Sequence, residues 1–211
     1  LSEQIYRILR EDILSQKIPC NARLTLKMLQ ERFGVSSTPI REALTRLINE
    51  QLISYYSNVG VSVVCLTEED LTEIYRFIGD LDSLAIRYAS EHPQQDRLIT
   101  ELSDNLTGTK SCDPESREWK TYSDDFHLIF YKYSRNSRLV HSAEQIRSQL
   151  SIAAYQYETI AETKETIFQE HQEIFRHYQS GNMEKAAAQM QLHLSHSLEY
   201  AKAWLKEQAF S

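Results

Sequence analysis

The chain has 211 residues, with few glycines and prolines (5 and 4) and 41% hydrophobic residues. This composition is typical of a mainly helical protein, long enough for one large domain or two small ones. No apolar run approaches the ~20 residues needed to cross a bilayer, and no secretory signal begins the chain. We therefore expect a cytoplasmic protein without membrane contact.

The net charge of −7 is unevenly distributed along the chain. Residues 1–64 hold 8 Lys and Arg against 6 Asp and Glu, whereas residues 65–211 hold 15 against 24. An acidic chain as a whole argues against nucleic-acid binding. A slightly basic front joined to a strongly acidic rear is instead expected when only the front approaches phosphates.

The three cysteines are Cys20, Cys65 and Cys112. An odd number at wide spacings suits neither a disulfide framework nor a clustered zinc site. The sequence therefore predicts three free thiols.

The front of the chain predicts two helices separated by a turn. A helical period of apolar residues runs from residue 2 to about residue 16, and Pro19 and Asn21 then interrupt it. Thr25 is a suitable N-cap for a second helix over 26–33. Gly34 follows at once, where a helix end favours a residue that tolerates positive φ.

A third helix is predicted after Gly34, in the stretch FGVSSTPIREALTRL. Ser36, or alternatively Thr38 before Pro39, can cap it. One face is an apolar stripe of Ile40, Ala43, Leu44, Leu47 and Ile48. The opposite face gathers Ser37, Thr38, Arg41 and Thr45, with Arg46 at its flank. Short hydroxyl side chains and forked cations suit base edges and phosphates in a DNA major groove. The alternative is an ordinary solvated helix face.

Two short β runs, 52–56 and 61–65, follow around a turn at 57–60. Three short helices and a hairpin predict a winged helix-turn-helix domain over 1–66. A purely structural helix pair is the alternative.

The remainder, 67–211, predicts an all-α bundle. Thr67 and Asp70 form a capping-box-like start for the first of six helices. The helices are expected over 67–91, 94–107, 114–134, 136–157, 160–179 and 182–208. The fold class is therefore mainly α: a winged helix-turn-helix followed by a six-helix bundle.

His127, His171 and His193 lie on three different predicted helices, each among apolar neighbours. One such histidine is more often a satisfied core residue than a ligand. Three on separate helices can converge in a bundle as a divalent-metal site, although no local spacing proves it. A polar pocket lined by histidines is the alternative.

Residues 1–66 resemble the DNA-binding domain of the GntR family of bacterial transcription regulators. The match lies in FGVSSTPIREALTRL, where the family shows G-V-S-R-T-P-V-R-E-A-L-x-x-L, and in NVGVSV, which resembles its wing tip. The resemblance implies DNA contacts from Ser36, Ser37, Thr38, Arg41, Thr45 and Arg46, and from Asn58 and Gly60 in the wing. Ser37 replaces an arginine that is commonly a base contact in the family, which puts the operator sequence in doubt.

Residues 68–211 resemble the FCD ligand-binding domain of the FadR subfamily, and six helices suggest its shorter VanR-like branch. The resemblance rests on LDSLAIRYASE, FHLIFYKYSRNSRL and EHQEIFRHYQSGNMEKAAAQMQLHL. It implies that His127, His171 and His193 hold a divalent metal such as Zn, Ni or Mn, beside an effector pocket. Ser123 stands where the family has a ligating aspartate, so Ser123, Asp124 and His196 are further possible participants.

Together these features predict a transcription regulator, not an enzyme. We expect a homodimer that binds a palindromic DNA operator, with affinity modulated by a small organic or sugar acid in the bundle. One alternative is a regulator for which the metal itself is the signal. Another is a three-histidine metalloenzyme, although no H-E-x-x-H, nucleophile elbow or phosphate loop supports it.

Overall fold

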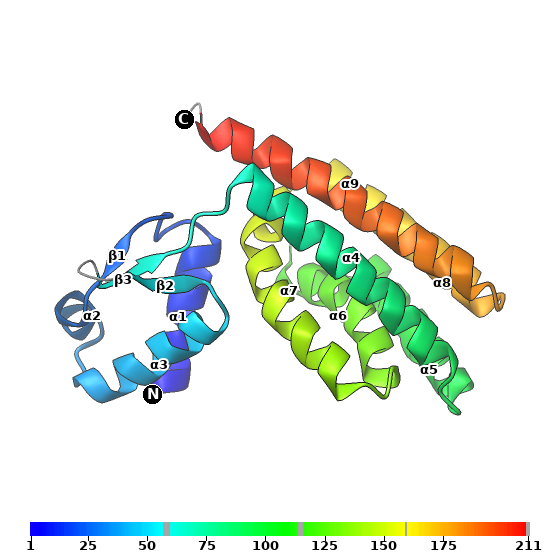
Figure 1. Cartoon of the computed structure of the whole chain (residues 1–211), viewed down its shortest axis with the longest axis horizontal. Coiled ribbons are helices and arrows are strands. Elements are labelled where there is room, and N and C mark those ends of the chain that lie inside the picture. The colour runs from blue at the N-terminus through cyan, green and yellow to red at the C-terminus, as the bar shows by residue number, and fades with distance from the viewer. Residues whose placement is uncertain (57–59, 114–115, 159, 210–211) are drawn as a thin grey trace.

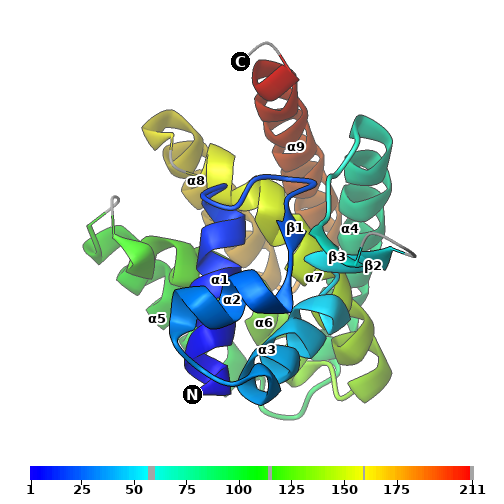
Figure 2. The ribbon, with the colours of Figure 1, turned by 90° about the vertical axis from the view of Figure 1, so that its left-hand side faces the viewer.

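The computed structural model describes residues 1–56, 60–113, 116–158 and 160–209. It has a small N-terminal winged helix-turn-helix domain and a larger bundle of long helices. The two domains lie side by side (Figure 1). Seen end-on, the small domain covers one end of the bundle (Figure 2). The fold class predicted from the sequence is confirmed. None of the described helices has the length and apolarity to cross a membrane.

The N-terminal domain contains α1 (Ser2–Leu14), α2 (Leu26–Phe33), α3 (Ser37–Asn49) and the strands β1 (Arg23–Leu24), β2 (Ile53–Tyr56) and β3 (Gly60–Val63). The sheet is antiparallel, in the order β1-β3-β2. Ser36 takes the N-cap position of α3 but its side chain makes no capping hydrogen bond, whereas the predicted signals around α2 are confirmed. The Thr25 hydroxyl accepts a hydrogen bond from the Met28 N–H at 3.2 Å, and Gly34 ends α2 with φ of 66°. These signals place the short turn that presents α3.

The predicted set of three free thiols is wrong, because Cys20 and Cys65 form a disulfide with their Cα atoms 5.1 Å apart. Only Cys112 is free. Strand β1 was not predicted from the sequence. It pairs Arg23 with Ser62 and so brings the turn after α1 beside the segment after β3. Two cysteines 45 residues apart in sequence thereby become neighbours.

The bundle consists of α4 (Glu68–Ser90), α5 (Gln95–Ser111), α6 (Arg117–Tyr133), α7 (Ser137–Tyr157), α8 (Ala161–Gln179) and α9 (Met183–Ala209). The predicted capping box is present: the Asp70 N–H donates to the Thr67 hydroxyl, and the Thr67 N–H donates to the Asp70 carboxylate. Helix α5 runs four residues beyond its predicted end at 107. Gly108 therefore lies inside the helix, where its missing side chain makes room for the Tyr122 ring, 2.5 Å from where a Cβ would lie.

Helix α7 docks the N-terminal domain onto the bundle. Ile152 is 7% exposed and buried in the core of the N-terminal domain, although it belongs to a bundle helix. Two hydrogen bonds form in the turn after Ile152: the Tyr155 hydroxyl donates to Glu11 at 2.9 Å, and the Gln156 amide donates to the Leu14 carbonyl at 2.6 Å. Both acceptors lie on α1, so α1 and α7 form one continuous interface.

Replacing Ile152 with alanine is expected to weaken this docking. Removing a buried isoleucine side chain costs about 2–5 kcal/mol, including the cavity left behind. In urea denaturation, Ile152→Ala should unfold the N-terminal domain at lower urea than the bundle, separating two transitions. Ile146→Ala is the matched control, since Ile146 lies on the same helix but packs against the bundle core. An unchanged midpoint for the N-terminal domain in Ile152→Ala would refute the role given to Ile152.

Candidate functional site

Helix α3 has one buried face and one exposed face. Ile40, Ala43, Leu44 and Leu47 are at most 6% exposed and form part of the domain core. Of the predicted stripe, only Ile48 departs, since it lies at the edge of the face and is 36% exposed. On the other side Ser36, Thr38, Arg41 and Thr45 are exposed and Ser37 is half-buried. The N-terminal half of α3 therefore presents hydroxyls and one guanidinium to solvent.

Arg46 differs from Arg41, because its guanidinium is already engaged within the protein. It donates to the Glu3 carboxylate and lies 3.8 Å from the centre of the Tyr6 ring. The hydrogen bond to Glu3 raises the pKa of Arg46 above its usual value. Arg46 would have to leave these partners on α1 to reach a phosphate.

At the wing, Gly60 has φ of 92°, a conformation that favours glycine. The Arg23 guanidinium lies beside it, 3.8 Å from the position of a Cβ on Gly60. Arg23 is exposed on β1. It was not singled out in the sequence, since β1 was not predicted. Asn58, the other predicted wing residue, lies outside the described residues.

The three predicted histidines converge inside the bundle from α6, α8 and α9. His127, His171 and His193 are 6%, 2% and 3% exposed, and each offers a ring nitrogen within 4.8 Å of the other two. The Nε2 atoms of His171 and His193 are 3.3 Å apart. The Phe126 ring stacks on the His171 ring, with centroids 4.2 Å apart. This places three imidazoles in one enclosed cluster.

Two buried carboxylates hold two of these rings from behind. Asp82 on α4 pairs with His127 Nδ1 at 2.7 Å, and Glu170 on α8 pairs with His193 Nδ1 at 2.7 Å. A carboxylate at Nδ1 fixes that nitrogen as the donor and leaves Nε2 with the lone pair, which in His193 faces His171 Nε2. Histidines that bind metal commonly have such a partner.

Asp82 accepts more than the bond from His127. The Tyr131 hydroxyl donates to it at 2.5 Å, and Arg147 Nη2 donates to both of its oxygens at 2.8 and 2.6 Å. Burial raises the pKa of Asp82, but the Arg147 charge and the hydrogen bonds from His127 and Tyr131 outweigh this and hold the pKa well below its usual range. Asp82 is therefore an anion with a full set of donors.

The donor set suits a divalent transition metal, because neutral imidazole is a favoured ligand for Zn, Ni and Cu. Burial, together with the nearby Arg147 guanidinium, lowers the pKa of His127 to about 4. Burial also lowers the pKa of His171 well below its usual value. Both rings are thus neutral at pH 7 and can offer a lone pair.

The additional ligands considered from the sequence lie in different surroundings. Asp124 faces Lys120, whose Nζ is 3.8 Å from its carboxylate. His196 pairs with Glu170 at 2.5 Å through its Nδ1. Ser123 is buried at 4% exposure, one helical turn before His127 on α6. Asp124 and His196 are thus held by other partners.

Four residues of the site were not predicted from the sequence: Asp82, Tyr131, Arg147 and Glu170. One signal was available for Asp82, because a charged residue interrupts the apolar stripe of α4 between Leu81 and Ala85. Glu170 directly precedes His171 on α8. No local pattern indicates a role for Arg147. It belongs to the site because it contacts Asp82, which is 65 residues away in sequence.

Replacing Asp82 with asparagine should destabilise the bundle, because Arg147 would keep its charge without a counter-charge. Breaking a buried pair by removing one partner typically costs roughly 3–5 kcal/mol. Urea denaturation measures this loss. Asp80→Asn is the control on the same helix, since Asp80 is exposed, and Asp82→Asn combined with Arg147→Met should recover part of the loss. A loss for Asp82→Asn no larger than that of the control would contradict the assignment.

Comparisons with known proteins agree with the two-part architecture. Residues 1–63 match bacterial regulatory proteins of the GntR family, and residues 73–196 match the FCD domain. The chain is 28% identical to an HTH-type transcriptional regulator, YdhC of Bacillus subtilis, over 97% of this chain and 92% of that one. It is 28% identical to the HTH-type transcriptional regulator McbR of Escherichia coli over 79% of this chain and 77% of that one.

Solved structures show the same fold. The structure of E. coli McbR/YncC has a TM-score of 0.71 at 25% identity and covers 99% of this chain and 98% of that one. A GntR regulator from Rhodococcus sp. RHA1, described as putative, has a TM-score of 0.73 at 18% identity and covers 96% of this chain and 97% of that one. The relatives are transcription regulators and not enzymes, which removes the metalloenzyme alternative. The chain is a transcriptional regulator of the GntR family with a C-terminal FCD domain.

Proposed function

We propose that this regulator binds a palindromic operator as a homodimer and that its DNA affinity responds to a ligand in the bundle, beside a divalent metal. The observation that carries the DNA interface is the exposed N-terminal half of α3. There, Thr38 and Arg41 are exposed, and Thr45 continues the same exposed face one turn beyond Arg41. Arg23 and Gly60 on the wing supply an exposed cation and a close backbone approach for phosphates.

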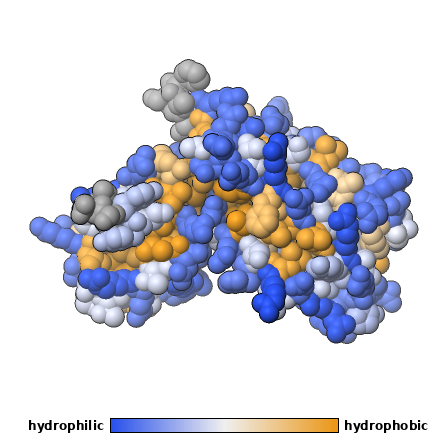
Figure 3. Space-filling model, viewed as in Figure 1, coloured by the Kyte–Doolittle hydropathy of each residue, from blue (hydrophilic) through white to orange (hydrophobic). Residues whose placement is uncertain are grey.

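A two-fold dimer supports this mode of binding, because two recognition helices must read symmetric half-sites. We place dimerisation in the bundle, residues 67–211, and DNA binding in residues 1–66. Apolar side chains are exposed on the bundle: Phe77 on α4 is 47% exposed and Leu192 on α9 is 45% exposed. Apolar surface also gathers over the bundle in the view of Figure 3. A partner subunit would cover such residues.

The histidine cluster is proposed to hold the metal through His127, His171 and His193. Bound there, the metal would act as a Lewis acid that attracts an anionic ligand. The Nε of Arg147 is buried without a hydrogen-bond partner among the described residues. Arg147 and His127 share the Asp82 carboxylate, so this spare donor lies next to the cluster. An organic or sugar acid suits both the donor and the metal.

Helix α7 offers the route from ligand to DNA. Arg147 contacts Asp82 beside the cluster, and Ile152 and Tyr155, farther along the same helix, contact the N-terminal domain. A ligand that binds Arg147 would favour a different position of α7. Because α7 contacts the N-terminal domain, the placement of α3 would change with it. The short six-helix bundle is compatible with the VanR-like branch of the FadR subfamily, and a cytoplasmic location fits a DNA-binding regulator.

Arg41→Ala should weaken operator binding by about 1–3 kcal/mol, or roughly 5- to 150-fold, because it removes a forked cation from the groove. The probe is a DNA duplex selected by the full-length protein from a randomised library, and fluorescence anisotropy measures the affinity. Lys185→Ala is the charge-matched control, since Lys185 is exposed in the first turn of α9, and this end of α9 lies far from the N-terminal domain (Figure 1). Wild-type affinity in Arg41→Ala, with an unchanged circular dichroism spectrum, would remove Arg41 from the interface.

His171→Ala should abolish metal binding, because it removes one of three donors from a site with few alternatives. Protein equilibrated with Zn²⁺, Ni²⁺ or Mn²⁺ and then desalted is analysed for bound metal. Wild type should retain one ion per cluster and gain thermal stability from it. His177→Ala, on the same helix but paired with Glu173 at the surface, should retain the ion.

Removing the metal with a chelator distinguishes a regulator that responds to an organic acid from one that responds to the metal itself. If the metal is itself the signal, its removal should change operator affinity without any added organic acid. If chelation leaves both affinity and thermal stability unchanged, the metal is neither signal nor structural element. Wild-type protein that retains no ion would reduce the cluster to a polar pocket.

A further inference from the structure

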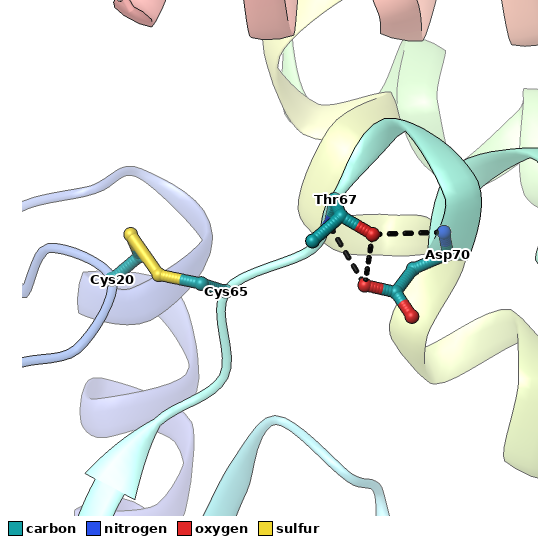
Figure 4. The surroundings of a disulfide bond; sticks show 4 residues. All are labelled: Cys20, Cys65, Thr67 and Asp70. Atoms are coloured by element: carbon teal, nitrogen blue, oxygen red, sulfur yellow. Dashed lines mark hydrogen bonds between the residues drawn. A yellow bond between two sulfur atoms is a disulfide. The ribbon is translucent and has the colours of Figure 1, made fainter.

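Cys20 and Cys65 lie at the junction between the two domains. Cys20 is in the turn from α1 to β1, and Cys65 is in the segment that leads from β3 to α4 (Figure 4). Thr67, which caps α4, follows Cys65 by two residues. The disulfide therefore ties the connection between the domains to the N-terminal domain immediately before the bundle begins.

The sheet keeps this pair together whether or not the sulfurs are bonded. Strands β1 and β3 pair Leu24 with Val61 and Arg23 with Ser62. Beyond Arg23 the Val63 N–H donates to the Ala22 carbonyl at 3.0 Å and the Asn21 N–H donates to the Val63 carbonyl at 3.1 Å, so two residues of one chain segment face one residue of the other. Asn21, with φ of 61°, then turns the chain so that Cys20 lies beside Cys65. Two free thiols would stay within reach of each other, so the bond can re-form after reduction.

The bond is also accessible. Cys20 is exposed and Cys65 is half-buried. A regulator that meets its operator in the cytoplasm is surrounded by dithiol reductants, and disulfides there are usually transient or redox-sensing. A disulfide at the surface, between residues that the fold keeps side by side, is better suited to reversible reduction than to permanent stabilisation.

We propose that Cys20 and Cys65 form a thiol–disulfide exchange site whose co-substrate is a dithiol, and that its state sets the freedom of the interdomain connection at residues 65–66. A thiolate of the dithiol attacks the sulfur of Cys20, forming a mixed disulfide and releasing Cys65 as a thiolate, which takes a proton. The second thiol then attacks the mixed disulfide, which closes the reductant's own disulfide and releases Cys20. Two electrons pass from the dithiol to the cystine.

After reduction the N-terminal domain keeps its contacts with α7, made from α1 and from Gln51, and has a freer connection to the bundle. Leu66, next to Cys65, packs against the cores of both domains, so its freedom bears on how the domains are placed. The consequence for DNA binding rests on the proposed function: preorganised winged domains lose less freedom on binding two half-sites. The two redox states should then differ in operator affinity.

The test uses the full chain with Cys112→Ser, which removes the third thiol, as the reference protein. The matched control adds Cys20→Ser and Cys65→Ser. Iodoacetamide labelling followed by mass spectrometry should find no free cysteine in the oxidised reference protein, two after dithiothreitol, and none again after exchange into glutathione disulfide. Hydrogen exchange of the amides of residues 64–70 should become about tenfold faster on reduction. The control variant should not respond to either reagent.

Three results would overturn the site: cysteines that are free before reduction, thiols that do not pair again, or equal exchange of residues 64–70 in both states. Faster exchange throughout residues 1–63 would also overturn it, since the bond would then be a structural staple. Operator affinity, measured on the duplex selected from the randomised library, should differ by about threefold or more between the states. Equal affinities would overturn the regulatory consequence, whereas failure to select any duplex would count against the proposed function and leave the labelling results standing.

Discussion

The carboxylate of Asp82 is the group on which the interior of the bundle depends. It is 1% exposed and accepts hydrogen bonds from His127 and Tyr131 on α6 and from Arg147 on α7. A buried anion is tolerated only with such a complement of donors, so α4, α6 and α7 must meet at this point. The same requirement turns His127 toward His171 and His193. The geometry of the cluster follows from the need to satisfy one charge.

Helix α7 extends this constraint to the far end of the molecule. One end of its contact surface neutralises Asp82, and the other completes the hydrophobic core of the N-terminal domain through Ile152. A rigid helix cannot adjust one of these contacts without moving the other. In the proposed mechanism the placement of α3 is thus tied to the state of the bundle interior, although no residue of α3 is among the contacts of the histidines in the described structure.

The features that the sequence predicted are those governed by residues a few positions apart. The cap at Thr25, the turn at Gly34, the capping box at Thr67 and the buried stripe of α3 all follow from local periodicity and hydrogen bonding. The features it missed depend on contacts across the chain. Strand β1 has two residues and no period, so neither it nor the Cys20–Cys65 pair could be foreseen. Arg147 belongs to the site only because α7 passes Asp82. Where the family resemblance implied an aspartate ligand, this chain has Ser123, so the proposed metal site rests on the three histidines.

Enclosure of the histidine cluster has a consequence for timing. His171 is 2% exposed and is covered on one side by the Phe126 ring. An ion or small molecule can enter or leave such a position only when neighbouring helices separate, and openings of this kind are rarer than the fluctuations of surface loops. Exchange of the proposed metal or effector would then be limited by how often the bundle opens. The proposed regulator would average over brief changes in ligand concentration and respond to sustained ones.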